Sequence, residues 1–152
     1  MKILITGSMG FISRNLIEKE FLNDEKILKI YGIDHIDTSI KSDKYQHYKL
    51  DLTNNNLGDL PSELFDVDLL IHTAGIPSPK FYKKEPFKTL FLNYEVTKFL
   101  LEKINHNTTF IYFSSGDIYG NPDLSNLPTK ESYYGYVSSI GDRSCYDESK
   151  RL

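Results

Sequence analysis

The chain has 152 residues, a size that fits one domain with its own hydrophobic core. Hydrophobic residues make up 39% and charged residues 26% of the sequence, as in globular proteins and unlike disordered chains. The 18 Lys and Arg residues and the 21 Asp and Glu residues give a formal net charge of −3. This balance argues against a dedicated nucleic-acid-binding protein, which usually has a strong basic excess.

Cysteine usage and hydropathy indicate the compartment. The single cysteine, Cys145, excludes an intramolecular disulfide and is typical of a reducing environment. No apolar run approaches the ~20 residues needed to span a bilayer. The apolar stretch within residues 1–7 is too short for a signal peptide and lacks a small-residue cleavage site. We therefore expect a soluble, cytoplasmic protein that binds neither nucleic acid nor membrane.

Short apolar runs alternate with longer amphipathic stretches along the chain. Strands are predicted over residues 2–6, 27–33, 45–50, 66–73 and 108–114. Helices are predicted over 11–21, over 86–104 and from about 142–145 onward, and 117–141 is predicted to be a long irregular connection. The alternation predicts an α/β fold, a doubly wound (Rossmann) parallel sheet with helices on both faces, in a single domain over residues 1–152.

A glycine-containing turn connects the first strand to the first helix, with the sequence Thr6-Gly7-Ser8-Met9-Gly10-Phe11-Ile12-Ser13. Glycines at such a turn let the backbone approach a pyrophosphate, which lies on the helix N-terminus. Asp34 ends the second strand, where an acid holds a ribose hydroxyl and disfavours the 2′-phosphate of NADP. Ser13 replaces the third glycine of the pattern, at a position that serves helix–strand packing. The combination favours an NAD site over an ordinary strand–turn–helix.

Tyr146 and Lys150 lie four residues apart and therefore on one face of the last predicted helix. A tyrosine with its unperturbed pKa near ~10 is a poor base at neutral pH. A lysine cation nearby favours the phenolate and so lowers that pKa. Together with the hydroxyl of Ser115, the pair can remove a proton from a sugar hydroxyl while a hydride leaves for a nicotinamide. Without the glycine turn upstream, the same spacing would indicate only a solvated helix face.

These motifs resemble those of the extended short-chain dehydrogenase/reductase (NAD-dependent epimerase/dehydratase) family of nucleotide-sugar enzymes. Within that family the chain is most similar to the UDP-glucuronate decarboxylases (UDP-xylose synthases). The similarity covers essentially all 152 residues and is most specific in 131–151 and in 77–97. It implies NAD-dependent oxidation at C4 of a nucleotide sugar, a UDP-sugar, by a lyase of polysaccharide biosynthesis. A 4-epimerase and a 4,6-dehydratase are the alternatives.

The resemblance also implies a role for each matched residue. The cofactor-binding residues would be Gly7, Gly10, Phe11, Ile12, Asp34, Asp51, Leu52, Ala74, Gly75, Tyr146 and Lys150. The catalytic residues would be Tyr146, Lys150, Ser115 and Asp117, and the residues around the substrate Tyr82, Ser115, Glu131 and Arg143. No metal site is expected, because no cluster of His, Cys and carboxylates has ligand spacing. His72 and Cys145 are expected to be packing residues.

Two adjacent residues depart from the decarboxylase pattern. Where those enzymes usually carry Ser and then Glu, this chain has Gly116 and Asp117, so that one hydroxyl is lost and the carboxylate is shorter. The sequence therefore supports oxidation at C4 better than the decarboxylation that follows it.

The chain is short compared with the family that it resembles. Members of the family are considerably longer, add a substrate domain after the Tyr–Lys helix, and are expected to form homodimers. We interpret residues 1–152 as an incomplete NAD-binding domain, the N-terminal part of such an enzyme, truncated before the substrate domain. The alternative from another class is a non-catalytic NAD-binding module. By itself the chain is expected to bind NAD weakly at best and not to catalyse turnover of a nucleotide sugar.

Overall fold

The computed structural model describes residues 1–54 and 57–152, which form two compact units. Unit 1 comprises residues 1–75 and 96–113, and unit 2 comprises residues 76–95 and 114–152. The sequence does not distinguish the two units, and the single domain over residues 1–152 stays a prediction.

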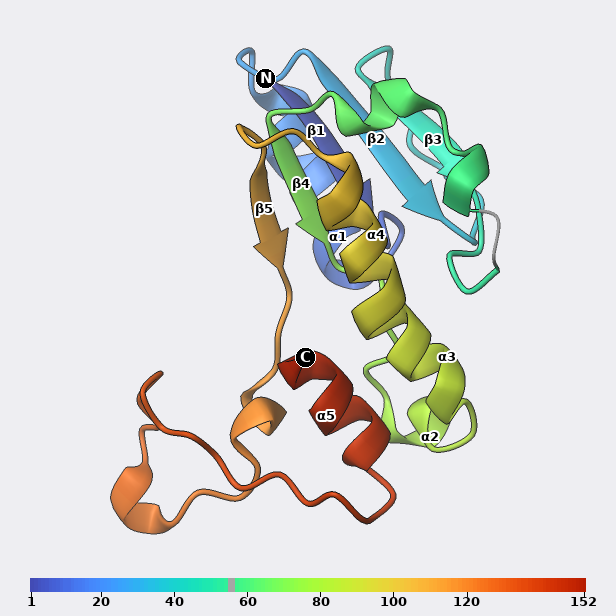
Figure 1. Ribbon diagram of the computed structural model, residues 1–152. Helices are drawn as coiled ribbons and strands as arrows, with labels where there is room; N and C mark the ends of the chain where they lie inside the picture. The colour runs from blue at the N-terminus through green and yellow to red at the C-terminus, as the bar shows by residue number, and fades with distance from the viewer. Residues whose placement is uncertain (55–56) are drawn as a thin grey trace. The chain divides into compact units, whose positions relative to one another are not determined.

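Unit 1 contains a five-stranded sheet in which every paired strand is parallel to its neighbour. The strands are β1 (Lys2–Thr6), β2 (Lys29–Asp34), β3 (Tyr45–Lys49), β4 (Leu69–His72) and β5 (Thr109–Tyr112), in the order β3-β2-β1-β4-β5 (Figure 1). The chain thus winds outward from β1 in one direction and then in the other. In open parallel sheets, ligands bind at the carboxyl ends of the strands where the winding reverses, which here is between β1 and β4.

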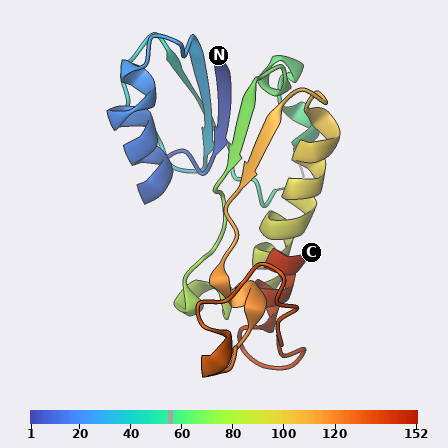
Figure 2. The same ribbon diagram turned by 90° about the vertical axis from the view of Figure 1, so that its left-hand side faces the viewer.

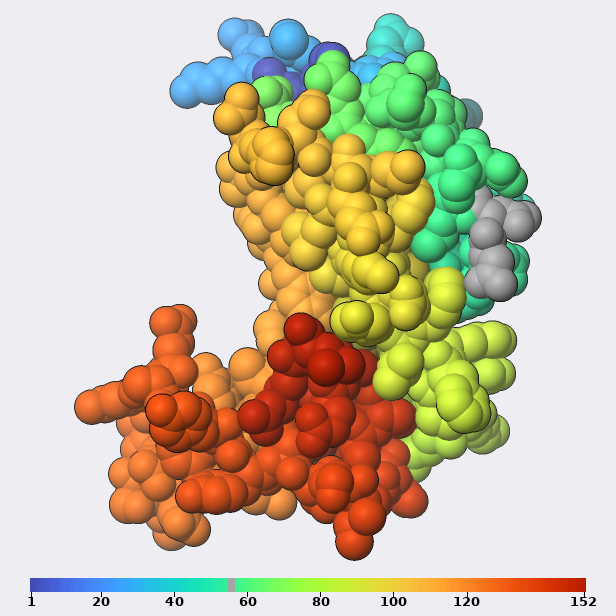
Figure 3. Space-filling view, viewed as in Figure 1, coloured from blue at the N-terminus to red at the C-terminus, as the bar shows by residue number. Residues whose placement is uncertain are grey.

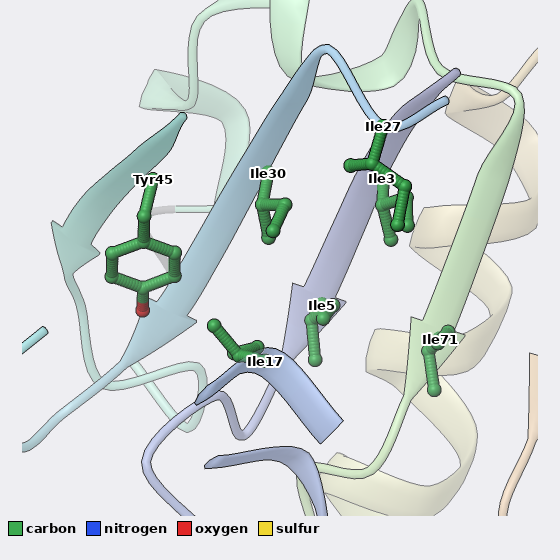
Figure 4. Packing of buried hydrophobic residues seen from close by; sticks show 7 residues of the cluster. All are labelled: Ile3, Ile5, Ile17, Ile27, Ile30, Tyr45 and Ile71. Carbon is green, nitrogen blue, oxygen red and sulfur yellow. The ribbon is translucent and has the colours of Figure 1, made fainter. Parts of the chain in front are cut away.

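Helices cover both faces of this sheet. The helix α1 (Phe11–Lys19) lies on one face and α4 (Val96–Lys103) on the other (Figure 2). Because both faces are covered, the central strands β1 and β4 bury apolar residues on both faces, namely Ile3, Leu4, Ile5, Leu70 and Ile71. On the α1 side the core consists of Ile3, Ile5, Ile17, Ile27, Ile30, Tyr45 and Ile71 (Figure 4).

Three short 3-10 helices complete unit 1: η1 (Phe21–Asn23), η2 (Leu57–Asp59) and η3 (Ser62–Phe65). The helix predicted over residues 11–21 ends at Lys19, and η1 follows it. Across residues 1–54 and 57–152, no helix is both long and apolar enough to cross a membrane.

Unit 2 consists of short helices and connections. Its helices are α2 (Pro79–Tyr82), α3 (Pro86–Leu90), the π-helical η4 (Phe91–Glu95), the 3-10 helices η5 (Gly116–Tyr119) and η6 (Leu124–Asn126), and α5 (Ser144–Arg151). The helix α5 packs against α3, η4 and η5. The single helix predicted over 86–104 corresponds to α3, η4 and α4, and α2 was not predicted.

The irregular connection predicted over 117–141 folds back on itself. The Tyr136 N–H donates to the Tyr119 carbonyl at 3.2 Å, and Gly120 and Tyr136 form an isolated β-bridge. A Cβ at Gly120 would lie 2.1 Å from the Tyr136 carbonyl oxygen, and Gly120 has a φ of +67°, so the close approach requires glycine. The connection and α5 are exposed together on the face seen in Figure 3.

Candidate functional site

The glycine turn at the carboxyl end of β1 leaves no space for a side chain at Gly7. Gly7 has a φ of +70°, and a Cβ there would lie 2.8 Å from the backbone nitrogen of Ala74 and 2.9 Å from Thr73 Oγ1. Gly10 is the N-cap of α1 and provides no capping side chain. The first amides of a helix have no partner within the helix and attract anions. The turn therefore presents a backbone surface that fits a pyrophosphate.

Phe11 and Ile12 begin α1, and the Phe11 side chain is 86% exposed. Their predicted role in holding the pyrophosphate therefore falls to their backbone N–H groups rather than to their side chains.

Asp34 lies at the carboxyl end of β2 with only 7% of its surface exposed. Its Oδ2 accepts a hydrogen bond from the Met9 N–H at 2.9 Å, and its Oδ1 accepts one from the Ile36 N–H at 3.1 Å. The carboxylate is thus fixed to the glycine turn. It lies at the sheet edge where the sequence places an adenosine ribose.

The remaining strand-end residues border the same sheet edge. The Leu50 N–H donates to the Asp34 carbonyl at 2.8 Å, so the chain that follows β3 runs beside Asp34. Asp51 is exposed, and its Oδ1 accepts from the Thr53 N–H at 2.9 Å. Leu52 is buried, which leaves its backbone as the part available to an adenine.

Ala74 and Gly75 follow β4 after one intervening residue, Thr73. The Ala74 N–H donates to Thr6 Oγ1 at 3.5 Å, at the end of β1. We call the Gly7 backbone and the N-terminal turn of α1 the cradle. The cradle and the Asp34 carboxylate belong to unit 1, and together they fit a dinucleotide.

His72 is a buried core residue, as the sequence predicts. Its Nδ1 lies 2.5 Å from Thr6 Oγ1, and its ring stacks on Tyr112 with a centroid separation of 5.7 Å. Within residues 1–54 and 57–152, no group of three or more His, Cys, Asp or Glu residues could hold a metal ion.

In unit 2, α5 carries the proposed base and its cation. Tyr146 is buried, and its ring stacks on Tyr82 with centroids 5.1 Å apart and an interplanar angle of 15°. Ser149 Oγ accepts a hydrogen bond from Asn93 Nδ2 at 2.9 Å and donates to the Tyr146 carbonyl at 3.1 Å. The π-helical η4, which contains Asn93, therefore holds the segment of α5 between Tyr146 and Lys150.

Burial lowers the pKa of Lys150 to about 8, because a buried ammonium loses hydration. At neutral pH the side chain is still protonated and can supply the positive charge that favours a phenolate. The charge is present below this pKa and is lost as the pH rises through it.

We expect an NMR titration of carbon-13-methylated lysines to show one resonance, assigned by its loss in Lys150→Arg, with a midpoint near pH 8. A midpoint at the ordinary lysine value of ~10.4 would contradict the burial of Lys150.

The residues after β5 form a polar cluster. Ser115 is the N-cap of η5, where its Oγ accepts from the Asp117 N–H at 3.2 Å and donates to Asp117 Oδ2 at 3.1 Å. The other oxygen, Asp117 Oδ1, lies 2.5 Å from a terminal nitrogen of Arg143. Asp117 therefore orients the Ser115 hydroxyl and is itself held by a cation.

Arg143 lies between two carboxylates. Its Nε is 3.8 Å from Asp147 Oδ1, and the neighbouring Asp117 raises the pKa of the guanidinium. Burial raises the pKa of the Asp147 carboxyl. These groups border a cavity of about 580 Å³ in unit 2, whose other lining residues include Lys83, Tyr136 and Asp142.

The structure brings some predicted site residues together within each unit and leaves one apart. The glycine turn, Asp34, Ala74 and Gly75 lie together in unit 1, and Ser115, Asp117 and Arg143 form one cluster in unit 2. Tyr82 contacts Tyr146. Glu131 is exposed on the long connection, and no hydrogen bond or ion pair within the described residues connects it to that cluster.

No role was predicted for Asp147, for Ser149 or for a contact between Ser13 and Thr73. Asn93 was part of the prediction only as a member of the matched range 77–97. The Ser13 and Thr73 hydroxyl oxygens lie 2.6 Å apart. The available signals were the position of Asp147 four residues after Arg143 and the serine in place of the third glycine.

Comparison with known proteins gives one family match and many relatives. The model of the NAD dependent epimerase/dehydratase family matches residues 3–152. UDP-glucuronic acid decarboxylase 6 of Arabidopsis thaliana is 34% identical over 100% of this chain and 44% of its own length. UDP-glucuronic acid decarboxylase 1 of Danio rerio is 31% identical over 99% of this chain and 35% of its own length. The chain thus spans less than half the length of these curated relatives.

Solved structures also match nearly all of this chain and about half of their own length. UDP-glucuronic acid 4-epimerase from Bacillus cereus, in complex with NAD, is 25% identical with a TM-score of 0.71, covering 99% of this chain and 50% of that one. UDP-glucose 4-epimerase from Thermotoga maritima is 23% identical with a TM-score of 0.74, covering 99% of this chain and 48% of that one. The second likeness concerns the fold alone, and the doubly wound Rossmann fold is confirmed.

Proposed function

Because the chain belongs to the NAD dependent epimerase/dehydratase family, we propose that it carries the cofactor-binding and proton-transferring residues of an enzyme that oxidises a nucleotide sugar at C4. One observation carries this proposal. A turn that fits a pyrophosphate and a helix that bears a tyrosine and a partly buried lysine cation occur in one chain. The curated relatives support UDP-glucuronate as the substrate and decarboxylation as the outcome.

NAD is the family's cofactor, and when bound it would accept a hydride from the sugar. The backbone of Gly7, Gly10 and the first turn of α1 would hold the pyrophosphate, where the helix N-terminus favours negative charge. Asp34 would accept hydrogen bonds from the adenosine ribose, and Tyr146 and Lys150 would hold the nicotinamide ribose.

Oxidation of the C4 alcohol to a ketone releases one proton together with the hydride. Tyr146 would take the proton as its phenolate, which a neighbouring ammonium such as that of Lys150 would stabilise. Ser115 would bind the C4 oxygen by turning its hydroxyl toward the sugar and away from Asp117 Oδ2, to which it donates at 3.1 Å in this structure.

Decarboxylation would follow from the chemistry of the ketone. In a glucuronate the carboxylate on C5 lies β to a ketone at C4, so the electrons of the breaking C–C bond pass into the ketone as CO2 leaves. A proton must then reach C5, and the hydride and a proton must return to C4 and its oxygen before the xylose is formed. Asp117 is the carboxylate beside Ser115, and Arg143 holds it in place.

A 4-epimerase acting on the same sugar is the second candidate. It is favoured by the short carboxylate of Asp117 and by Gly116, which has no hydroxyl. The 4-epimerase from Bacillus cereus, which is named for UDP-glucuronic acid, shares the fold.

The test uses UDP-glucuronate deuterated at C4, added with NAD to the native polypeptide that carries this sequence. We expect deuterium to pass transiently to the nicotinamide and then to return to C4, so that CO2 and UDP-xylose deuterated at C4 are formed. UDP-galacturonate as the product would favour the epimerase. Turnover in which rapid-quench samples show no deuterium on the nicotinamide at any time would contradict oxidation at this carbon.

A further inference from the structure

The serine that replaces the third glycine of the turn makes a specific side-chain contact. Ser13 lies in the first turn of α1 and is 1% exposed. Its Oγ is 2.6 Å from Thr73 Oγ1, which lies directly after β4 and sixty positions away in the sequence. The sequence pattern predicts only a small residue at this position, whereas the structure shows a buried pair of hydroxyl groups.

The donor in this pair follows from counting protons. Thr73 Oγ1 is 2.7 Å from the Thr6 carbonyl and 3.3 Å from the Gly7 carbonyl, and carbonyl oxygens only accept hydrogen bonds. The single hydroxyl proton of Thr73 is therefore directed to the β1–turn backbone. Ser13 must donate to Thr73, and the hydrogen bonds run from α1 through the end of β4 to the end of β1.

The pair lies directly behind the surface that fits the pyrophosphate. A Cβ at Gly7 would come within 2.9 Å of Thr73 Oγ1, so the threonine hydroxyl packs against the glycine. Ser13 follows Gly10, the N-cap of α1, by three residues. The same two hydroxyls therefore fix both parts of the cradle, the Gly7 backbone and the N-terminal turn of α1.

We propose that Ser13 and Thr73 are paired positioning residues for NAD binding. Where the usual glycine sets the distance between helix and strand by close packing, this chain sets it with a hydrogen bond. The bond holds the amides of the first turn of α1 in place for the pyrophosphate. The inference rests on the proposed function only through NAD and is independent of the sugar and of the reaction.

A purely structural role is the competing explanation, and Thr108 provides a matched control. Thr108 Oγ1 donates to the Val67 carbonyl at 2.7 Å, just before β5 and thus at the opposite end of the same sheet. Thr108→Val removes a threonine hydroxyl and its hydrogen bond to a carbonyl without touching the cradle. It therefore reports what a loss of stability alone does to NAD affinity.

The experiment measures NAD binding by titration calorimetry, and thermal unfolding in parallel, for the full chain. We expect Ser13→Ala and Thr73→Val each to raise the Kd by up to about 10-fold, because a buried hydrogen bond contributes about 0.5–1.5 kcal/mol and 1.4 kcal/mol is tenfold. The double variant should bind like Thr73→Val, since that variant already lacks the bond that Ser13→Ala removes. Thr73→Ser keeps the hydroxyl and should restore most of the affinity. Thr108→Val should lower the Tm with a Kd within about twofold of the parent.

Three results would overturn the proposal. They are parental affinity in both single variants, an equal rise of the Kd in Thr108→Val, and single effects that multiply in the double variant. If Ser13→Ala does not fold, Ser13→Gly removes the same donor with the residue that the pattern expects, and an unchanged Kd would again contradict the proposal. Parent chain that binds no NAD would overturn the cofactor assignment together with this inference, whereas unchanged variants of an NAD-binding parent overturn only the inference.

Discussion

Tyr146→Phe is expected to lower the rate of NAD reduction by a nucleotide sugar at least ~100-fold, because a positioned general base contributes about 10²–10⁴-fold. The substitution removes only the phenolic oxygen. The ring that stacks on Tyr82 at 5.1 Å is retained, so α5 should keep its packing. NAD affinity is measured alongside, so that weaker binding is not mistaken for a slower chemical step.

Tyr48→Phe is the matched control. The Tyr48 hydroxyl accepts a hydrogen bond from Gln46 Nε2 at 2.6 Å on β3 and has no part in the proposed chemistry. This variant should reduce NAD at the parental rate. A near-parental rate in Tyr146→Phe would exclude Tyr146 as the base, whatever the control shows.

Gly7→Ala is expected to have the second large effect, on both folding and NAD binding. A φ of +70° costs a residue with a Cβ about 1–2 kcal/mol. The new methyl group would also lie 2.8 Å from the Ala74 nitrogen, which is backbone and cannot rotate away. We expect the free energy of unfolding to fall by at least ~2 kcal/mol and the Kd for NAD to rise at least ~10-fold, since the displaced turn forms the cradle.

Gly58→Ala separates these effects from a general loss of glycine. An added Cβ at Gly58 meets nothing within 4 Å, so the free energy of unfolding should change by no more than about 0.5 kcal/mol. Chemical denaturation and NAD titration of the two variants give the comparison. Parental stability and parental affinity in Gly7→Ala would show that the turn tolerates a side chain and is not the cradle described above.

The sheet was largely predictable because β1, β2, β4 and β5 contain apolar residues and end near polar or glycine residues, whereas β3 alternates tyrosines with polar residues. The boundaries were less predictable, as Ile27 illustrates. This residue is fully buried in the α1-side core, yet pairing between β2 and β1 begins only at Lys29. An apolar pattern reports burial, whereas the start of a strand is set by pairing with another segment.

The helical region from 86 to 103 shows a second limit of prediction from sequence periodicity. Periodicity predicted one continuous helix, but residues 91–95 are π-helical and place Asn93 against Ser149 of α5. Such a change of register depends on a contact between segments far apart in the sequence. The helix propensities of residues 91–95 therefore do not predict the π-helical segment.

The candidate site also contains features that the sequence predicts and features that it does not. The glycine turn with Asp34 and the Tyr146–Lys150 spacing are local patterns tied to particular elements, so the sequence located them. The Asp117–Arg143 ion pair and the Ser13–Thr73 hydroxyl pair join distant segments. Residue type alone could not reveal these partners, because many serines and acidic residues in the chain could serve equally well.

A crystal structure of the native polypeptide with NAD tests most directly whether the turn and the Tyr–Lys helix bind the two ends of one cofactor. We expect the pyrophosphate to accept hydrogen bonds from the first-turn amides of α1 and the adenosine ribose to contact Asp34. The nicotinamide ribose should contact Tyr146 and Lys150. A cofactor whose pyrophosphate lies away from the turn, or whose nicotinamide does not reach Tyr146, would contradict the proposed site.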